Sequence, residues 1–142
     1  MEIGSLSSDF TKETLRTMPA ELILIVDDDP ICLSVARLVL SRAGFATQTA
    51  ADGTEALDLL KTLQPDLIVS DIQMPRMDGF ELARRARQIS RLHDTPMIAL
   101  TAFANQDAEQ QAYDAGFTAY VSKPVNGSGL TIAVRRILAR AA

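Results

Sequence analysis

The feature that most constrains the fold of this chain is a regular alternation of short apolar runs with helical patterns. Residues 22–26, 67–69 and 97–100 are apolar throughout, which is typical of strands buried on both faces of a sheet. Residues 45–50 and 119–121 are more polar, and we expect them to be strands nearer the edges of the sheet. The sequence therefore predicts five strands.

Five segments that follow these runs carry apolar residues at helical spacing. Their apolar positions are Ile31, Val35, Leu38 and Val39, then Ala56, Leu59, Leu60 and Leu63, then Phe80, Ala83 and Ala86, then Ala108, Ala112 and Ala115, and finally Leu130, Val134, Ile137 and Leu138. Asp29 with Pro30 predicts the start of the first helix, and Gly44 and Gly116 predict the ends of the first and fourth. Because right-handed crossovers place helices on both faces of a parallel sheet, we expect an α/β fold.

Length and composition favour one globular domain with a tail. The chain has 142 residues, of which 47% are hydrophobic and 23% are charged, as is typical of a soluble protein. Residues 1–20 are rich in Ser and Thr and lack the apolar stretch of a signal peptide, and no apolar run is long enough to span a membrane. We therefore expect an N-terminal tail over residues 1–20, a domain over residues 21–142 and a cytoplasmic location.

The charged and metal-binding side chains exclude some classes of function. A net charge of −4 argues against direct binding to nucleic acid, and a single Cys and a single His leave no cluster for zinc. A group of arginines on and after the third helical segment is interpreted as a solvated helix face. Its members are Arg84, Arg85, Arg87 and Arg91.

Polar side chains stand at the carboxyl ends of the expected strands, where open parallel sheets bind ligands. These residues are Asp27, Asp28 and Asp29 after the first run, Asp71 after the third, Thr101 after the fourth and Lys123 after the fifth. Carboxylates that converge on one point raise one another's pKa unless a cation neutralises them, and Mg²⁺ prefers such oxygen ligands. A hydroxyl and a lysine beside that ion suit the binding of phosphoryl oxygens.

Two absences refine this interpretation. The sequence has no Gly-rich loop of the kind that holds a nucleotide, and no histidine lies near a position suited to a general base. We therefore expect the phosphoryl group to arrive from another molecule and to be transferred to a carboxylate, which is a competent nucleophile toward phosphorus.

Four motifs, "LIVDDDP", "LIVSDIQMPRMDGFEL", "ALTA" and "YVSKP", occur in the order and spacing of a known family. From about Glu21 to its C-terminus the chain resembles the receiver domain of two-component response regulators. The resemblance implies a flavodoxin-like (βα)5 fold, with a five-stranded parallel sheet of order 2-1-3-4-5. It also implies a phosphoacceptor that catalyses only its own phosphorylation and dephosphorylation, with a sensor histidine kinase or a histidine phosphotransfer protein as its partner.

The resemblance assigns roles to residues that match the motifs. Asp71 is then the phosphoacceptor, and Asp27, Asp28, Asp71 and the backbone carbonyl of Gln73 are the ligands of Mg²⁺. Thr101 and Lys123 bind phosphoryl oxygens, and Tyr120 turns inward on activation.

Further features follow from the same resemblance. The Lys123–Pro124 bond is expected to be cis. The family dimerises or docks partners through its fourth helix, fifth strand and fifth helix, and we expect the same surface to switch here. Gln73 and Phe103 occupy the positions where the family varies to set the lifetime of the phosphoryl group.

The same residues allow three alternative interpretations. Asp29 is better interpreted as the cap of the first helix than as a metal ligand. Asp27 and Asp29 form a D-x-D pattern similar to that of haloacid-dehalogenase phosphatases, in which Asp27 would be the nucleophile. Ile31 departs from that pattern, Asp71 has no role in it, and the chain leaves no room for a cap domain. A pseudo-receiver that takes no phosphate is disfavoured by the complete set of acidic, hydroxyl and lysine residues.

Overall fold

The computed structural model describes residues 20–102, 105–125 and 127–141. Its five strands are all parallel and follow the order β2-β1-β3-β4-β5, which confirms the predicted flavodoxin-like sheet. The strands are β1 Leu22–Val26, β2 Ala46–Ala50, β3 Leu67–Asp71, β4 Met97–Thr101 and β5 Ala119–Ser122. Except for Ala20, the predicted tail lies outside the described residues, and so does Phe103.

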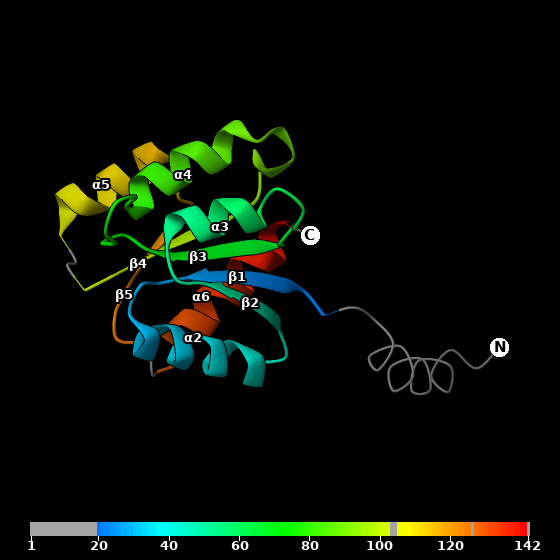
Figure 1. The fold of residues 1–142 in the computed structure, drawn as a ribbon. Coiled ribbons are helices and arrows are strands. Elements are labelled where there is room, and N and C mark those ends of the chain that lie inside the picture. The colour runs from blue at the N-terminus through cyan, green and yellow to red at the C-terminus, as the bar shows by residue number, and fades with distance from the viewer. Residues whose placement is uncertain (1–19, 103–104, 126, 142) are drawn as a thin grey trace, which may run out of the picture.

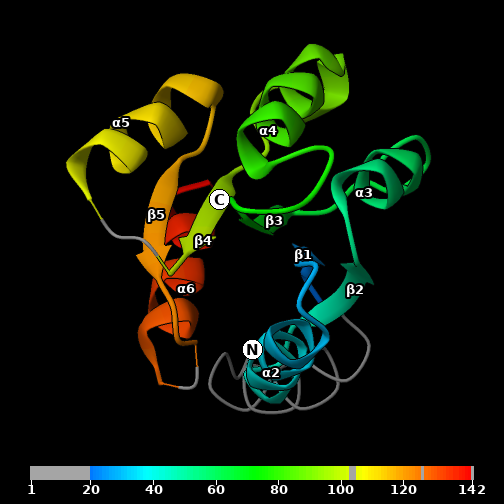
Figure 2. The same cartoon turned by 60° about the vertical axis from the view of Figure 1, so that its left-hand side comes forward.

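Helices cover both faces of the sheet (Figure 1). The α-helices are α2 Pro30–Arg42, α3 Gly53–Leu59, α4 Gly79–Gln88, α5 Gln106–Ala115 and α6 Gly129–Ala141, and a short 3-10 helix, η1, spans Ser90–Leu92. Helices α2 and α6 pack on one face, while α3, α4 and α5 pack on the other, as Figure 2 also shows. No helix in the described part of the chain is long and apolar enough to cross a membrane.

The central strands supply side chains to both halves of the core. In β3, Ile68 packs beneath α3 and α4, whereas Leu67 and Val69 pack beneath α2 and α6, because successive side chains of a strand point to opposite faces. Every residue of β3 and β4 is buried, while the edge strands β2 and β5 are only partly buried. The predicted contrast between apolar central strands and polar edge strands is confirmed.

Two strands extend further than their apolar runs. β3 continues through Ser70 to Asp71, which pairs in register with Leu100, and β4 continues to Thr101, which pairs in register with Ser122. Asp27 and Lys123 follow β1 and β5 directly, as predicted, whereas Asp71 and Thr101 are the last residues of β3 and β4. Their backbone is fixed by the sheet, which positions their side chains at its carboxyl edge.

The second helix is shorter than its apolar pattern. α3 ends at Leu59, so Leu63 lies beyond it, although Leu63 still packs against the core. Arg91 donates hydrogen bonds to the carbonyls of Leu60 and Leu63, which pairs backbone groups of the turn that follows the helix.

The prediction of a solvated arginine face is wrong for Arg87. Arg84 and Arg85 are exposed and pair with Glu81 at 3.2 and 2.7 Å, as expected for a solvated face. Arg87 instead lies partly buried between α4 and α5 and donates to backbone carbonyls beyond both helices. The sequence pattern cannot show such carbonyls, because they become available only where the chain turns.

Candidate functional site

The site lies where β1, β3, β4 and β5 end at one edge of the sheet. Three of the residues predicted from strand ends are buried there, with exposed fractions of 1% for Asp27, 6% for Asp71 and 2% for Thr101. Burial of two carboxylic acids and a hydroxyl at one edge is unusual for purely structural residues, because burying a charge is costly unless it is paired.

Asp27, Asp28 and Asp71 form a cluster of three carboxylates. One oxygen from each lies within 4.8 Å of the others. The Oδ1 atom of Asp27 accepts a hydrogen bond from the Asp29 N–H at 2.9 Å, which fixes the orientation of this carboxylate. Asp28 is exposed, so the cluster opens to solvent on one side.

Lys123 reaches this cluster from the end of β5. Its Nζ atom lies 2.8 Å from Oδ2 of Asp27 and 3.5 Å from Oδ2 of Asp71. Burial alone would lower the pKa of Lys123, but the neighbouring carboxylates of Asp27 and Asp71 raise it above its usual value. Lys123 is therefore a permanent cation at neutral pH. The Lys123–Pro124 peptide is cis, as predicted.

The Asp71 carboxylate is electrostatically strained. Burial, together with the negative charge of Asp27, raises its pKa to about 6, while Lys123 and a hydrogen bond from the Gln73 backbone N–H act in the opposite direction. The single positive charge of the Lys123 ammonium cannot neutralise the negative charges of three carboxylates. The donor set, oxygen ligands with a side open to water, fits a hard divalent cation such as Mg²⁺.

Asp29 lies outside this cluster, as predicted. It is the N-cap of α2, and its Oδ1 accepts a hydrogen bond from the Ile31 N–H at 3.0 Å. Its other carboxylate oxygen accepts from the Cys32 thiol at 3.3 Å. These contacts account for Asp29 without a role at the site.

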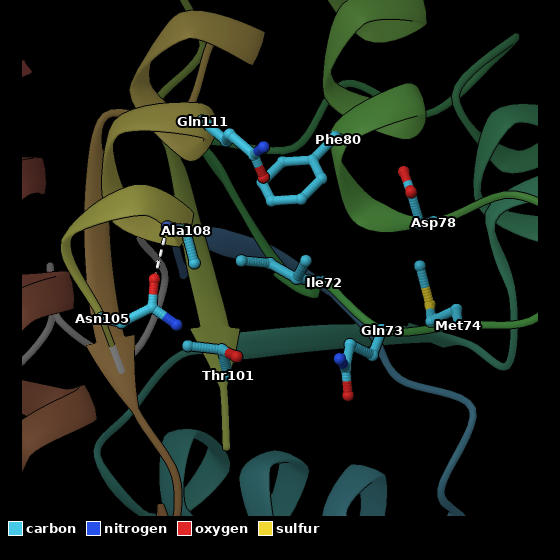
Figure 3. Close-up of a pocket in the computed structure, with 9 residues that line it drawn as sticks. All are labelled: Ile72, Gln73, Met74, Asp78, Phe80, Thr101, Asn105, Ala108 and Gln111. Atoms are coloured by element: carbon cyan, nitrogen blue, oxygen red, sulfur yellow. Dashed lines mark hydrogen bonds between the residues drawn. The ribbon is translucent and has the colours of Figure 1, made fainter. Parts of the chain in front are cut away.

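Thr101 and Tyr120 occupy adjacent strands on the other side of Asp71. The Thr101 carbonyl accepts a hydrogen bond from the Lys123 N–H at 2.8 Å, so the two residues are held at one level of the sheet. Thr101 also lines a cavity of about 670 Å³ together with Gln73 (Figure 3). Tyr120 is partly buried and packs against the core beneath α3, α4 and α5.

The loop after β3 approaches Asp71 more closely than the sequence indicated. A Cβ atom on Gly79 would lie 2.4 Å from the backbone oxygen of Asp71 and 2.8 Å from Cα of Ile72. Gly79 also donates its N–H to the Ile72 carbonyl at 2.7 Å. Asp78 caps the next helix, α4, by accepting a hydrogen bond from the Glu81 N–H at 2.9 Å.

Sequence reasoning missed Ser70. This residue is fully buried, and its hydroxyl donates a hydrogen bond to the Asp71 carbonyl at 2.9 Å. A serine within an apolar strand gives no signal of such a contact, because the pattern does not show which backbone carbonyl its hydroxyl reaches.

Comparison with known proteins agrees with this geometry. The family model of the response regulator receiver domain matches residues 23–135. The chain belongs to this family. The receiver domain is similar to DivK, the polar-differentiation response regulator of Brucella anthropi, with 36% identity over 104 residues, which cover 73% of this chain and 85% of DivK.

Solved receiver structures resemble this chain over most of its length. Chemotaxis protein CheY4 of Vibrio cholerae is 33% identical with a TM-score of 0.80, and the match covers 83% of this chain and 98% of CheY4. TrrA of Thermotoga maritima, solved in complex with Mg²⁺ and BeF, is 31% identical with a TM-score of 0.74, covering 82% of this chain and 98% of TrrA. The receiver domain is thus a module of two-component signalling, and the phosphatase alternative is not favoured.

The raised pKa of Asp71 predicts a pH-dependent stability difference. The folded metal-free domain binds a proton at Asp71 more tightly than the unfolded chain does, because the pKa rises from 3.8 to about 6 on folding. This stabilisation is present below the unfolded value and is lost as the pH rises through about 6. Asp71→Asn, which removes the charge, should therefore raise the free energy of unfolding by about 2 kcal/mol at neutral pH and have little effect near pH 4.

Urea unfolding in the presence of EDTA at both pH values measures this difference. Asp58→Asn is a matched control, because Asp58 is exposed and pairs with the exposed Lys61. An Asp71→Asn variant that is no more stable than the wild type at neutral pH would contradict the prediction.

Proposed function

We propose that the receiver domain accepts a phosphoryl group from a phosphohistidine onto Asp71, and that the reaction depends on Mg²⁺. The observation that carries this proposal is the placement of the Asp71 carboxylate within a carboxylate cluster and 3.5 Å from the Lys123 ammonium. A buried acid with this pKa is mostly ionised at neutral pH, as a nucleophile must be.

The transfer forms one bond and breaks one. A carboxylate oxygen of Asp71 attacks phosphorus, the bond from phosphorus to the imidazole nitrogen breaks, and the imidazole leaves with the electron pair. The product is an acyl phosphate on Asp71. Lys123 would neutralise charge on the phosphoryl oxygens, and Thr101 on the adjacent strand would supply a hydroxyl donor.

Asp27, Asp28, Asp71 and the backbone carbonyl of Gln73 would hold the Mg²⁺ ion. When bound, the ion supplies positive charge that offsets the charge of the carboxylates and of the incoming phosphoryl group. The fit of the oxygen donors and the solved complex of TrrA with Mg²⁺ and BeF support this choice of metal.

Switching would follow from movement of Thr101 toward the phosphoryl group. Tyr120 lies on β5 beneath α5, and its inward rotation would occupy the space that Thr101 leaves. The surface that changes is formed by α5, β5 and α6, the fourth helix, fifth strand and fifth helix of the domain. This surface would dimerise or bind an output partner, while a sensor histidine kinase or a histidine phosphotransfer protein would supply the phosphoryl group.

Intact mass spectrometry after incubation with acetyl phosphate and Mg²⁺ tests the proposal. We expect a mass increase of one phosphoryl group, and we expect EDTA to prevent it. The adduct should be lost at alkaline pH, since acyl phosphates hydrolyse there. A domain that gains no mass under these conditions, or gains it equally with EDTA, would overturn the proposal.

A further inference from the structure

The two halves of α5 differ in how many of their side chains are buried against the rest of the domain. Its buried side chains, Ala112 and Ala115, both lie in the C-terminal half, and the buried Phe117 follows directly after the helix. Among residues 106–111, which form the N-terminal half, none is buried. The N-terminal cap of the helix joins residues of its own first turn, because the Asn105 side chain accepts a hydrogen bond from the Ala108 N–H at 2.8 Å (Figure 3).

Arg87 of α4 anchors the C-terminal end of α5. Its Nε and Nη2 atoms both donate to the carbonyl of Gly116, at 3.0 and 2.7 Å. Gly116 is the left-handed C-cap of α5, with a φ of 119°. A Cβ atom at Gly116 would lie 2.8 Å from Cγ of Arg87, so the stem of the arginine packs directly against this cap.

The same guanidinium is tied to the segment that leads into β4. Nη1 donates to the carbonyls of Leu92, His93 and Thr95. One side chain thus connects four backbone carbonyls in two separate segments of the chain. Such a fork of donors is available only to arginine, since lysine carries its hydrogen-bond donors on a single nitrogen.

A cavity lies beside the other end of the helix. Ala108 and Gln111 line it from the N-terminal half of α5, Phe80 lines it from α4, and Thr101 and Gln73 line it from the site (Figure 3). The part of α5 that has few buried contacts is therefore next to open space, and that space reaches the residues beside Asp71.

From these observations we infer that Arg87 is a positioning residue that makes α5 a lever, with its pivot at Gly116 and its N-terminal half free to move across the cavity. The lever is about 15 Å long, since a ten-residue helix rises 1.5 Å per residue. A change at Thr101 would then tilt α5 rather than translate it. The pivot is a property of the resting domain, whereas its use in signalling rests on the proposed phosphorylation.

Amide exchange measured by NMR in the unphosphorylated domain tests the pivot. In the wild type, amides of residues 112–117 should exchange at least roughly tenfold more slowly than those of residues 109–111. Arg87→Met should remove this difference, whereas Arg84→Met, which removes an exposed ion pair of the same helix, should preserve it. Equal exchange in both halves of the wild-type helix, or an unchanged difference in Arg87→Met, would overturn the inference.

Two further variants serve if Arg87→Met does not fold. Arg87→Lys keeps the positive charge but cannot reach four carbonyls at once. Gly116→Ala adds a Cβ atom that would lie 2.8 Å from Cγ of Arg87 and so displaces the arginine from the Gly116 carbonyl. Both should abolish the exchange difference, and its persistence in both would overturn the inference.

A second measurement follows phosphorylation by acetyl phosphate and Mg²⁺. Exchange should change in residues 109–111 and stay within about twofold in residues 112–117. If mass spectrometry shows the phosphoryl adduct but exchange changes uniformly along α5, the lever is wrong and the proposed function stands. If no adduct forms while the resting difference depends on Arg87, the proposed function is wrong and the pivot stands.

Discussion

Asp71→Asn should abolish labelling of the receiver domain by acetyl phosphate, with a loss of at least about 100-fold in rate. An amide is not a nucleophile toward phosphorus, and among the residues that the structure describes no other side chain takes the place of the Asp71 carboxylate between the acidic pair and Lys123. The substitution preserves shape and removes an unfavourable charge, so the variant should remain folded. Intact mass spectrometry measures the loss, and thermal unfolding confirms that it is not caused by misfolding.

Asp27→Asn is the informative comparison for Asp71→Asn. Asp27 pairs with Lys123 at 2.8 Å and belongs to the same cluster, so its loss should slow labelling without abolishing it. Labelling that survives Asp71→Asn and disappears in Asp27→Asn would contradict the assignment of the phosphoacceptor. It would place the nucleophile on β1, as the D-x-D alternative requires.

The site residues were predictable because their positions follow from topology. Once the apolar runs are recognised as parallel strands, the residues that end them must share one edge of the sheet. This argument alone brings Asp27, Asp71, Thr101 and Lys123 together, although they are far apart in the sequence. It also separates Asp29 from the site, since a carboxylate directly before Pro30 is a favourable helix cap.

Contacts to backbone atoms were not predictable. The Ser70 hydroxyl, the Arg87 guanidinium and the Gly79 Cα all meet carbonyl groups whose positions depend on how distant segments pack. A pattern of apolar and polar residues describes which side chains are buried, but it contains no information on which carbonyls a turn leaves without a helical partner. Arg87 therefore resembled the exposed arginines beside it in the sequence.

Gly79→Ala should destabilise the domain strongly, by about 3 kcal/mol. The added Cβ would lie 2.4 Å from the Asp71 oxygen and 2.8 Å from Cα of Ile72, and neither backbone atom can move without disturbing β3. Relief would require the loop after β3 to withdraw, which would break the hydrogen bond from the Gly79 N–H to the Ile72 carbonyl. Urea unfolding measures the loss of stability.

Gly129→Ala is the matched control for Gly79→Ala. Gly129 is also the first residue of a helix, but a Cβ there would meet no atom within 4 Å, so alanine should be neutral or slightly stabilising. Because the Asp71 carbonyl belongs to the phosphoacceptor itself, Gly79→Ala should also slow labelling by acetyl phosphate under conditions where the variant is fully folded. A Gly79→Ala domain as stable as Gly129→Ala would contradict the close approach of this loop to Asp71. Normal labelling of a destabilised variant would instead show that the displacement does not reach the carboxylate.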